Sequence, residues 1–108
     1  LVVAGHVGSH SDEEIREMTR VVAKIQPVLF LVPEIKDYLR GRKIGEIPGL
    51  VLDELRQLEF AEENIGTSET CLDGVHRAVA QIKSGDLLML VGLVDQNEIL
   101  AFLEELKP

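Results

Sequence analysis

The chain has 108 residues, a mass of 12.0 kDa and 45% apolar residues, which suits one domain with its own core. Its formal net charge of −8 would repel phosphates, so we expect no general binding to nucleic acid or to anionic membranes. One cysteine excludes an internal disulfide, no apolar run approaches the roughly 20 residues of a membrane helix, and we expect a reducing compartment, the cytoplasm.

Short apolar runs alternate with amphipathic segments, a pattern typical of a layered α/β domain. Residues 1–4, closed by Gly5, predict a buried strand. Residues 11–14 (SDEE) have the capping-box pattern and predict a helix that ends before Pro27. The helical spacing predicts an inward face for this helix, made of Ile15, Met18, Val21, Val22 and Ile25.

Residues 28–32 (VLFLV) are apolar at every position, as a strand of a parallel sheet requires, and Pro33 is expected to end that strand. A helix is predicted from about 48 to 58. Its buried side should carry Val51, Leu55 and Leu58. Residues 60–65 are a weaker strand candidate because they are more polar.

The pair Thr67-Ser68 is predicted to open the next helix, and Ser84-Gly85 to end it. The buried stripe of that helix should be Leu72, Val75, Val79 and Ile82. Residues 87–91 predict another strand, and 95–98 a second capping box that opens the last helix. This last helix should turn inward Ile99, Phe102, Leu103 and Leu106.

Together these elements predict a single α/β domain over residues 1–108, a Rossmann-like open, mostly parallel sheet with helices on both faces in three layers. Ligands of such sheets bind beyond the carboxyl ends of the strands, so the loops at 5–10, 33–45 and 92–97 are the candidate regions. The first loop lacks the phosphate-binding motifs and runs into an acidic helix start, which favours a plain turn with solvent-exposed His6 and His10. In the third loop, helix capping accounts for Asp95.

The second loop carries four of the eleven basic residues within a short segment of an acidic chain. These four are Lys36, Arg40, Arg42 and Lys43. A guanidinium can give a carboxylate or phosphate two parallel hydrogen bonds, each charge-assisted bond contributing about 1.5–3 kcal/mol. Asp37, three residues before Arg40, is placed to orient it. A solvated loop whose cations offset Glu34 and Glu46 is an equally good interpretation of the composition.

Other reactive residues form no recognised catalytic pattern. Cys71 lies at a predicted helix start, where a thiolate is favoured, but no histidine accompanies it in the sequence. His76 is expected on the flank of a helix. The spacings of a zinc site, a Ser/His/Asp order and a G-x-S-x-G elbow are absent, so no metal ligand and no catalytic residue is predicted.

Three segments, VVAGHVGSHSDEEIREM, DYLRGRKIGEIPGLVLDEL and KSGDLLMLVG, together resemble the last domain of the Mur ligase family, most closely its cyanophycin synthetase branch. The branch's D-x-x-R-G-R-x-x-G-E segment is matched by Asp37, Arg40, Gly41, Arg42, Gly45 and Glu46. Its glycine-aspartate pair before an apolar strand is matched by Gly85 and Asp86.

The resemblance implies the closing domain of a longer, ATP- and Mg²⁺-dependent amide ligase, inactive by itself. Its partners would be the N-terminal and central ATPase domains of the same polypeptide, an amino acid or peptide acceptor, and further copies in a homo-oligomer. Arg40, supported by Asp37 and Arg42, would bind the acceptor. Ser9 and His10 stand where the family often has G-D-R, and Asp95 lies in a segment that differs from the family's G-K-G-H-E, so these three are secondary candidates.

The residues alone leave two other kinds of function open. One is a small, non-catalytic α/β module that binds an anion, or regulates, through the same basic loop. The other is a purely structural or dimerising domain.

Overall fold

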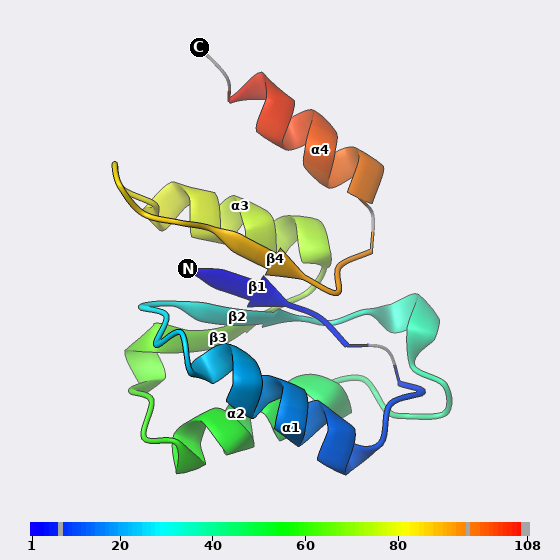
Figure 1. Ribbon diagram of the computed structural model, residues 1–108. Helices are drawn as coiled ribbons and strands as arrows, with labels where there is room; N and C mark the ends of the chain where they lie inside the picture. The colour runs from blue at the N-terminus through cyan, green and yellow to red at the C-terminus, as the bar shows by residue number, and fades with distance from the viewer. Residues whose placement is uncertain (7, 95, 107–108) are drawn as a thin grey trace.

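The computed structural model describes residues 1–6, 8–94 and 96–106 and shows a four-stranded sheet between two helical layers (Figure 1). The strands are β1 (Val2–Ala4), β2 (Phe30–Pro33), β3 (Ile65–Ser68) and β4 (Met89–Val91). Their order is β3-β2-β1-β4, and every neighbouring pair is parallel.

Two helices cover each face of the sheet (Figure 1). On one face lie α1 (Asp12–Ala23) and α2 (Glu46–Gln57), and on the other α3 (Cys71–Gln81) and α4 (Gln96–Glu105). Short 3₁₀ turns occupy Lys36–Tyr38 and Glu62–Asn64. The predicted three-layer, Rossmann-like α/β architecture is therefore confirmed. In the described ranges, no helix has both the length and the apolar character that crossing a bilayer requires.

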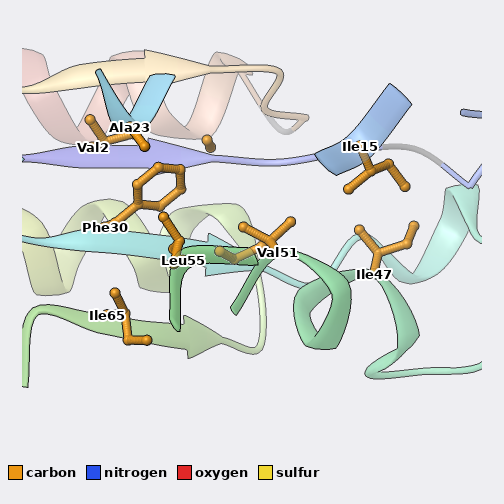
Figure 2. Packing of buried hydrophobic residues seen from close by; sticks show 10 residues of the cluster. Val2, Ile15, Ala23, Phe30, Ile47, Val51, Leu55 and Ile65 are labelled. Atoms are coloured by element: carbon orange, nitrogen blue, oxygen red, sulfur yellow. The ribbon is translucent and has the colours of Figure 1, made fainter. Parts of the chain in front are cut away.

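Apolar side chains fill both faces of the two central strands. Val2 and Phe30 pack toward α1 and α2, whereas Val3 and Leu31 pack on the opposite side, because successive residues of a strand point to opposite faces. Phe30 is fully buried in the apolar cluster between the sheet and helices α1 and α2 (Figure 2). Burying such a side chain contributes about 2 kcal/mol, so uninterrupted apolar runs are the expected signature of strands covered on both sides.

The predicted capping box of α1 is confirmed in both directions. The Glu14 backbone N–H donates to Ser11 Oγ at 3.1 Å, and the Ser11 N–H donates to a Glu14 carboxylate oxygen at 2.9 Å. These bonds to Ser11 lower the pKa of Glu14. The loop after β1 therefore enters α1 through a reciprocal cap that satisfies the amides of Ser11 and Glu14.

Removing the Ser11 hydroxyl tests this cap. We expect Ser11→Ala to lower the free energy of unfolding by about 1 kcal/mol, because the Glu14 amide loses its partner. Urea denaturation measures the change, and Ser84→Ala, at an exposed serine outside the helices, is the control. Equal stability of the two variants would contradict the prediction.

The buried side of α1 differs from the predicted apolar face. Ile15, Thr19 and Ala23 are the buried residues, while the predicted inward residues Val21 and Ile25 are 57% and 54% exposed. Thr19 tolerates burial because its hydroxyl donates to the Ile15 carbonyl at 2.8 Å. Periodicity locates an apolar face, but the packing of the helix against the rest of the fold decides how much of it is covered.

Met18, the remaining misplaced residue of that face, is 37% exposed. Two leucines near helix ends were also expected inward and are half exposed: Leu58, at 41%, and Leu106, at 50%. Each follows or ends a helix, where few neighbours are available to cover it.

The third strand lies later in the chain than predicted. Residues 60–65 include a 3₁₀ turn, and β3 begins at Ile65 and contains Thr67-Ser68, which were expected to open a helix. The helix starts at Cys71 instead, with the Thr70 hydroxyl accepting the Asp73 N–H at 3.0 Å, and it ends at Gln81, before Ser84-Gly85. β3 lacks an apolar run because it is an edge strand in which Thr67 is exposed and Gly66 is partly exposed.

The other strand boundaries shift by one or two residues. β2 starts at Phe30 and includes Pro33, and Val28, expected inside, is 68% exposed. β4 starts at Met89, two residues after the predicted start at Leu87, which is 75% exposed.

Candidate functional site

The carboxyl ends of all four strands meet at one edge of the sheet, since every strand pair is parallel (Figure 1). The loops that follow β1 and β2 lie against each other there. The Gly8 N–H donates to the Tyr38 carbonyl at 2.7 Å. A Cβ on Gly8 would lie 1.7 Å from the Leu39 carbonyl oxygen, so only glycine permits this approach.

A cleft of about 800 Å³ opens at the same edge, beyond the ends of β2 and β3 and between the first turns of α2 and α3. Its apolar wall comes from the α2 side and consists of Ile44, Pro48 and Leu52. Its polar wall comes mainly from the β3–α3 side and consists of Ser68, Glu69, Asp73, His76 and Arg77. Such a mixed lining suits a small polar molecule that carries both charged and apolar parts.

Lys36 is the member of the basic loop that lines this cleft. It is joined by Arg77, whose guanidinium also donates to the Thr67 carbonyl, and by the carboxylates of Glu69 and Asp73. Sequence analysis missed the contribution of α3. The polar residues in the first turns of α3 follow a strand and could have indicated this side of the cleft. They were overlooked because the preceding strand was predicted at residues 60–65 instead of Ile65–Ser68.

The amino end of α2 is already occupied by a carboxylate of the chain. Gly45 has a left-handed φ of 87° at the helix cap, and its N–H donates to Glu34, a residue only 8% exposed. A glycine takes this conformation without strain. Glu34 thus offsets the helix terminus rather than the neighbouring cations, and this helix end is not an open anion site.

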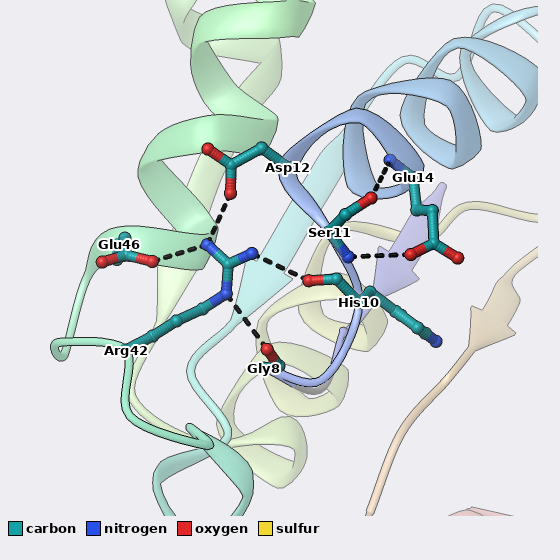
Figure 3. Close-up of polar contacts among 7 residues, drawn as sticks. All are labelled: Gly8, His10, Ser11, Asp12, Glu14, Arg42 and Glu46. Atoms are coloured by element: carbon teal, nitrogen blue, oxygen red, sulfur yellow. Dashed lines mark hydrogen bonds and ion pairs between the residues drawn. The ribbon is translucent and has the colours of Figure 1, made fainter.

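Arg42 connects the two loops at the edge (Figure 3). Its Nη1 lies 2.8 Å from Asp12 and 2.5 Å from Glu46. Its Nε donates to the Gly8 carbonyl at 3.2 Å and its Nη2 to the His10 carbonyl at 2.8 Å. Asp12 first and then Glu46 raise the pKa of Arg42.

The Arg42 side chain is only 14% exposed, so its guanidinium faces the chain's own oxygens. Holding an external carboxylate would require breaking some of these contacts. The geometry therefore gives Arg42 the part of a positioning residue for the basic loop, and substrate binding by Arg42 stays a prediction.

Arg40 differs from Arg42 in its exposure and in its contacts. It is exposed, its backbone has a left-handed φ of 53°, and its guanidinium carbon lies 6.0 Å from the Tyr38 ring centroid. Asp37 is exposed too, and within the described ranges no ion pair joins it to Arg40. The wall of the cleft includes neither residue. Arg40 thus presents its charge to solvent, outside the lining of the cleft.

Sequence analysis placed two histidines on the surface, and this is wrong for His6. His6 is only 5% exposed, His10 is half-buried, and their ring centroids lie 6.4 Å apart. Burial, and to a smaller extent His10, lowers the pKa of His6 to about 4. Ser9 is exposed in the same loop.

Three candidate residues from the sequence remain: Cys71, His76 and Asp95. Cys71 is 1% exposed in the cluster between α3 and α4, which removes it from the surface. His76 is exposed, lines the cleft and stacks on Phe102 with centroids 3.9 Å apart. Asp95 lies outside the described residues.

Comparison of the chain with protein-family models, with curated proteins and with solved structures gives no match.

Proposed function

We propose that this chain is the closing, acceptor-binding domain of an ATP-dependent amino acid ligase of the Mur type, inactive without its partner domains. The observation that carries the proposal is the exposed Arg40 at the carboxyl edge of a parallel sheet. It lies on a segment that Arg42 connects to the loop after β1. A charge held at that edge is placed where open α/β sheets bind ligands.

In this proposal the partner domains would bind ATP, which would supply the phosphoryl group that activates the first substrate's carboxylate, and Mg²⁺, which would offset the phosphate charge. The acceptor's amine then forms the amide bond, the bond from carbonyl carbon to phosphate oxygen breaks, and the amine loses a proton. Residues of the present chain do not fit the nucleotide. The first turn of α1 is acidic and is capped by Ser11, and no group of three metal-ligating side chains occurs in the described ranges.

The chain's own part is to hold the acceptor. Arg40 gives the acceptor's carboxylate a charge-assisted, two-pronged hydrogen bond, and Arg42 keeps the loop in place. Lys36, from the same loop as Arg40, adds a second positive charge in the lining of the cleft, whose apolar wall contacts the rest of the acceptor. Holding the amine in a fixed orientation is what such a domain contributes to rate.

Substituting Arg40 in the full-length ligase tests the proposal. We expect Arg40→Ala to raise the KM for the amine acceptor about tenfold or more, because the two-pronged, charge-assisted hydrogen bond to the carboxylate is lost. ATP-dependent amide formation is measured with varied acceptor. Lys24→Ala, an exposed cation at the end of α1, is the control and should leave KM unchanged.

Unchanged acceptor KM and kcat in Arg40→Ala would remove Arg40 from the site. A full-length protein that forms no amide with ATP and any acceptor amino acid would overturn the proposed function.

A non-catalytic anion-binding or regulatory module is the second candidate. It is favoured by the positive charges that this chain alone brings to one edge of the sheet, because Lys36 and Arg77 line the cleft and Arg40 is exposed in the same loop as Lys36. Calorimetry of the chain alone with inorganic phosphate and with glutamate separates the two. Binding abolished by Arg40→Ala, in a protein that lacks ligase activity, would support the module.

A further inference from the structure

The cleft between α2 and α3 carries charges of both signs that the chain does not pair. Five Lys, Arg, Asp and Glu residues line it, and one of them, Glu34, already accepts the Gly45 N–H. The other four are two cations and two carboxylates: Lys36, Arg77, Glu69 and Asp73. Within the described ranges, no ion pair joins any of these four to another residue. Since their charges cancel, the cleft favours a ligand with separated charges and no net charge over a simple anion or cation.

Arg77 is held in the wall of the cleft without pairing with the nearby carboxylates. Asp73 and Arg77 lie one turn apart on α3, the spacing at which opposite charges can pair. The Arg77 guanidinium donates to the Thr67 carbonyl of β3 instead. Three other arginines do pair with carboxylates of the chain: Arg20, Arg42 and Arg56. The cleft therefore keeps charges of both signs available to a bound molecule.

Gly49 leaves open space on the apolar side of the cleft. It lies inside α2 and lines the cleft beside Pro48 and Leu52. A Cβ at Gly49 would have no atom within 4 Å, so packing within the chain does not require glycine here. Glycine inside a helix is destabilising relative to alanine. The volume that a side chain would fill is instead open to the apolar part of a ligand.

We propose that this cleft binds a zwitterionic α-amino acid with an aliphatic side chain. Its carboxylate binds Lys36 and Arg77, and its ammonium group binds Glu69 and Asp73. Its side chain lies over Gly49, against the apolar wall. The cleft volume of about 800 Å³ suits a small molecule. The separated charges and the aliphatic part follow from the lining, whereas the choice of an α-amino acid rests on the proposed function, in which this molecule is the acceptor.

Amide ¹H–¹⁵N spectra of the chain, titrated with three related molecules, test the ligand class. L-Leucine carries both charges, L-leucinamide lacks the carboxylate, and 4-methylpentanoate lacks the amine. We expect leucine to shift the amide signals of Gly49 and Asp73. It should bind about tenfold or more tightly than either analogue, because each analogue leaves one pair of charges in the cleft without its partner.

Substitutions in the chain test the place of binding. Gly49→Leu should abolish the leucine-induced shifts, because the new side chain fills the open space, and it should not lower the free energy of unfolding. Gln57→Leu adds the same side chain at the exposed end of α2, outside the cleft, and as the matched control should bind leucine like the original chain. Asp73→Asn and Lys36→Gln should each weaken leucine binding about tenfold.

Absence of leucine-induced shifts in the original chain overturns the inference, and so does binding of either analogue as tightly as leucine. Unchanged leucine binding in Gly49→Leu removes the ligand from this cleft. None of these results decides the proposed function, which the Arg40→Ala kinetics of the full-length ligase test separately. Leucine binding by a chain whose full-length protein forms no amide would keep the cleft as an amino acid site and remove only its role in holding an acceptor.

Discussion

Replacing Arg42 with methionine should lower the free energy of unfolding by about 3 kcal/mol or more, because two charge-assisted hydrogen bonds are lost. Methionine keeps the apolar stem but leaves the carbonyls of Gly8 and His10 without their donor, and each such charged hydrogen bond contributes about 1.5–3 kcal/mol. The two ion pairs add less, because Asp12 and Glu46 are 54% and 41% exposed and water screens them.

Urea denaturation measures this change, and Arg40→Met is the matched control two residues away. The exposed Arg40 should alter stability by no more than about 0.5 kcal/mol. Arg42→Lys should recover part of the loss, because an ammonium keeps the charge but not the planar guanidinium geometry. If Arg42→Met is as mild as Arg40→Met, Arg42 does not hold the loops together, and a direct role in binding substrate gains support.

The second large effect concerns pH. The free energy of unfolding should fall by on the order of 3 kcal/mol as the pH drops from about 7 to about 4, through His6 alone. The folded-state pKa of His6 is about 4, below the unfolded value of 6.5. Between these values the unfolded chain binds the extra proton, so stability is fully present above about pH 6.5 and is lost as the pH falls.

Denaturant unfolding at a series of pH values checks this prediction. His6→Gln should flatten the curve in that window even if its stability at pH 7 is lower, because glutamine does not titrate. His76→Gln, which removes an exposed histidine, should keep the slope. Identical slopes in the original chain and in His6→Gln would show that His6 takes up no proton on unfolding. His10, which lies near His6, is unchanged in both variants.

The basic loop shows how far sequence alone reaches toward a site. Clustering of cations after the second strand predicts a charged segment at the carboxyl edge, and the segment lies there. Sequence does not separate Arg40 from Arg42, although one guanidinium is exposed and the other contacts four oxygens of its own chain. The difference in exposure between the two arginines depends on contacts such as that of Arg42 with Gly8, which lies 34 residues away along the chain.

Tertiary contacts also decide where the cleft opens and why His6 is buried. Ser68, Asp73 and Arg77 line the cleft because β3 pairs with β2. This pairing places the first residues of α3 near the carboxyl end of β2. His6 looks like a surface residue between glycines, yet it is only 5% exposed in the folded chain.

By itself, the sequence determined the alternation of strands and helices, the capping box at Ser11 and the apolar character of β1 and β2 on both faces. These features depend on neighbours within about four residues or on solvent exclusion along a run, so local patterns carry them. Only the tertiary structure decided which arginine stays available, how much of α1 is covered and where the cleft opens. Those outcomes depend on contacts between segments distant in sequence, whose geometry no local pattern encodes.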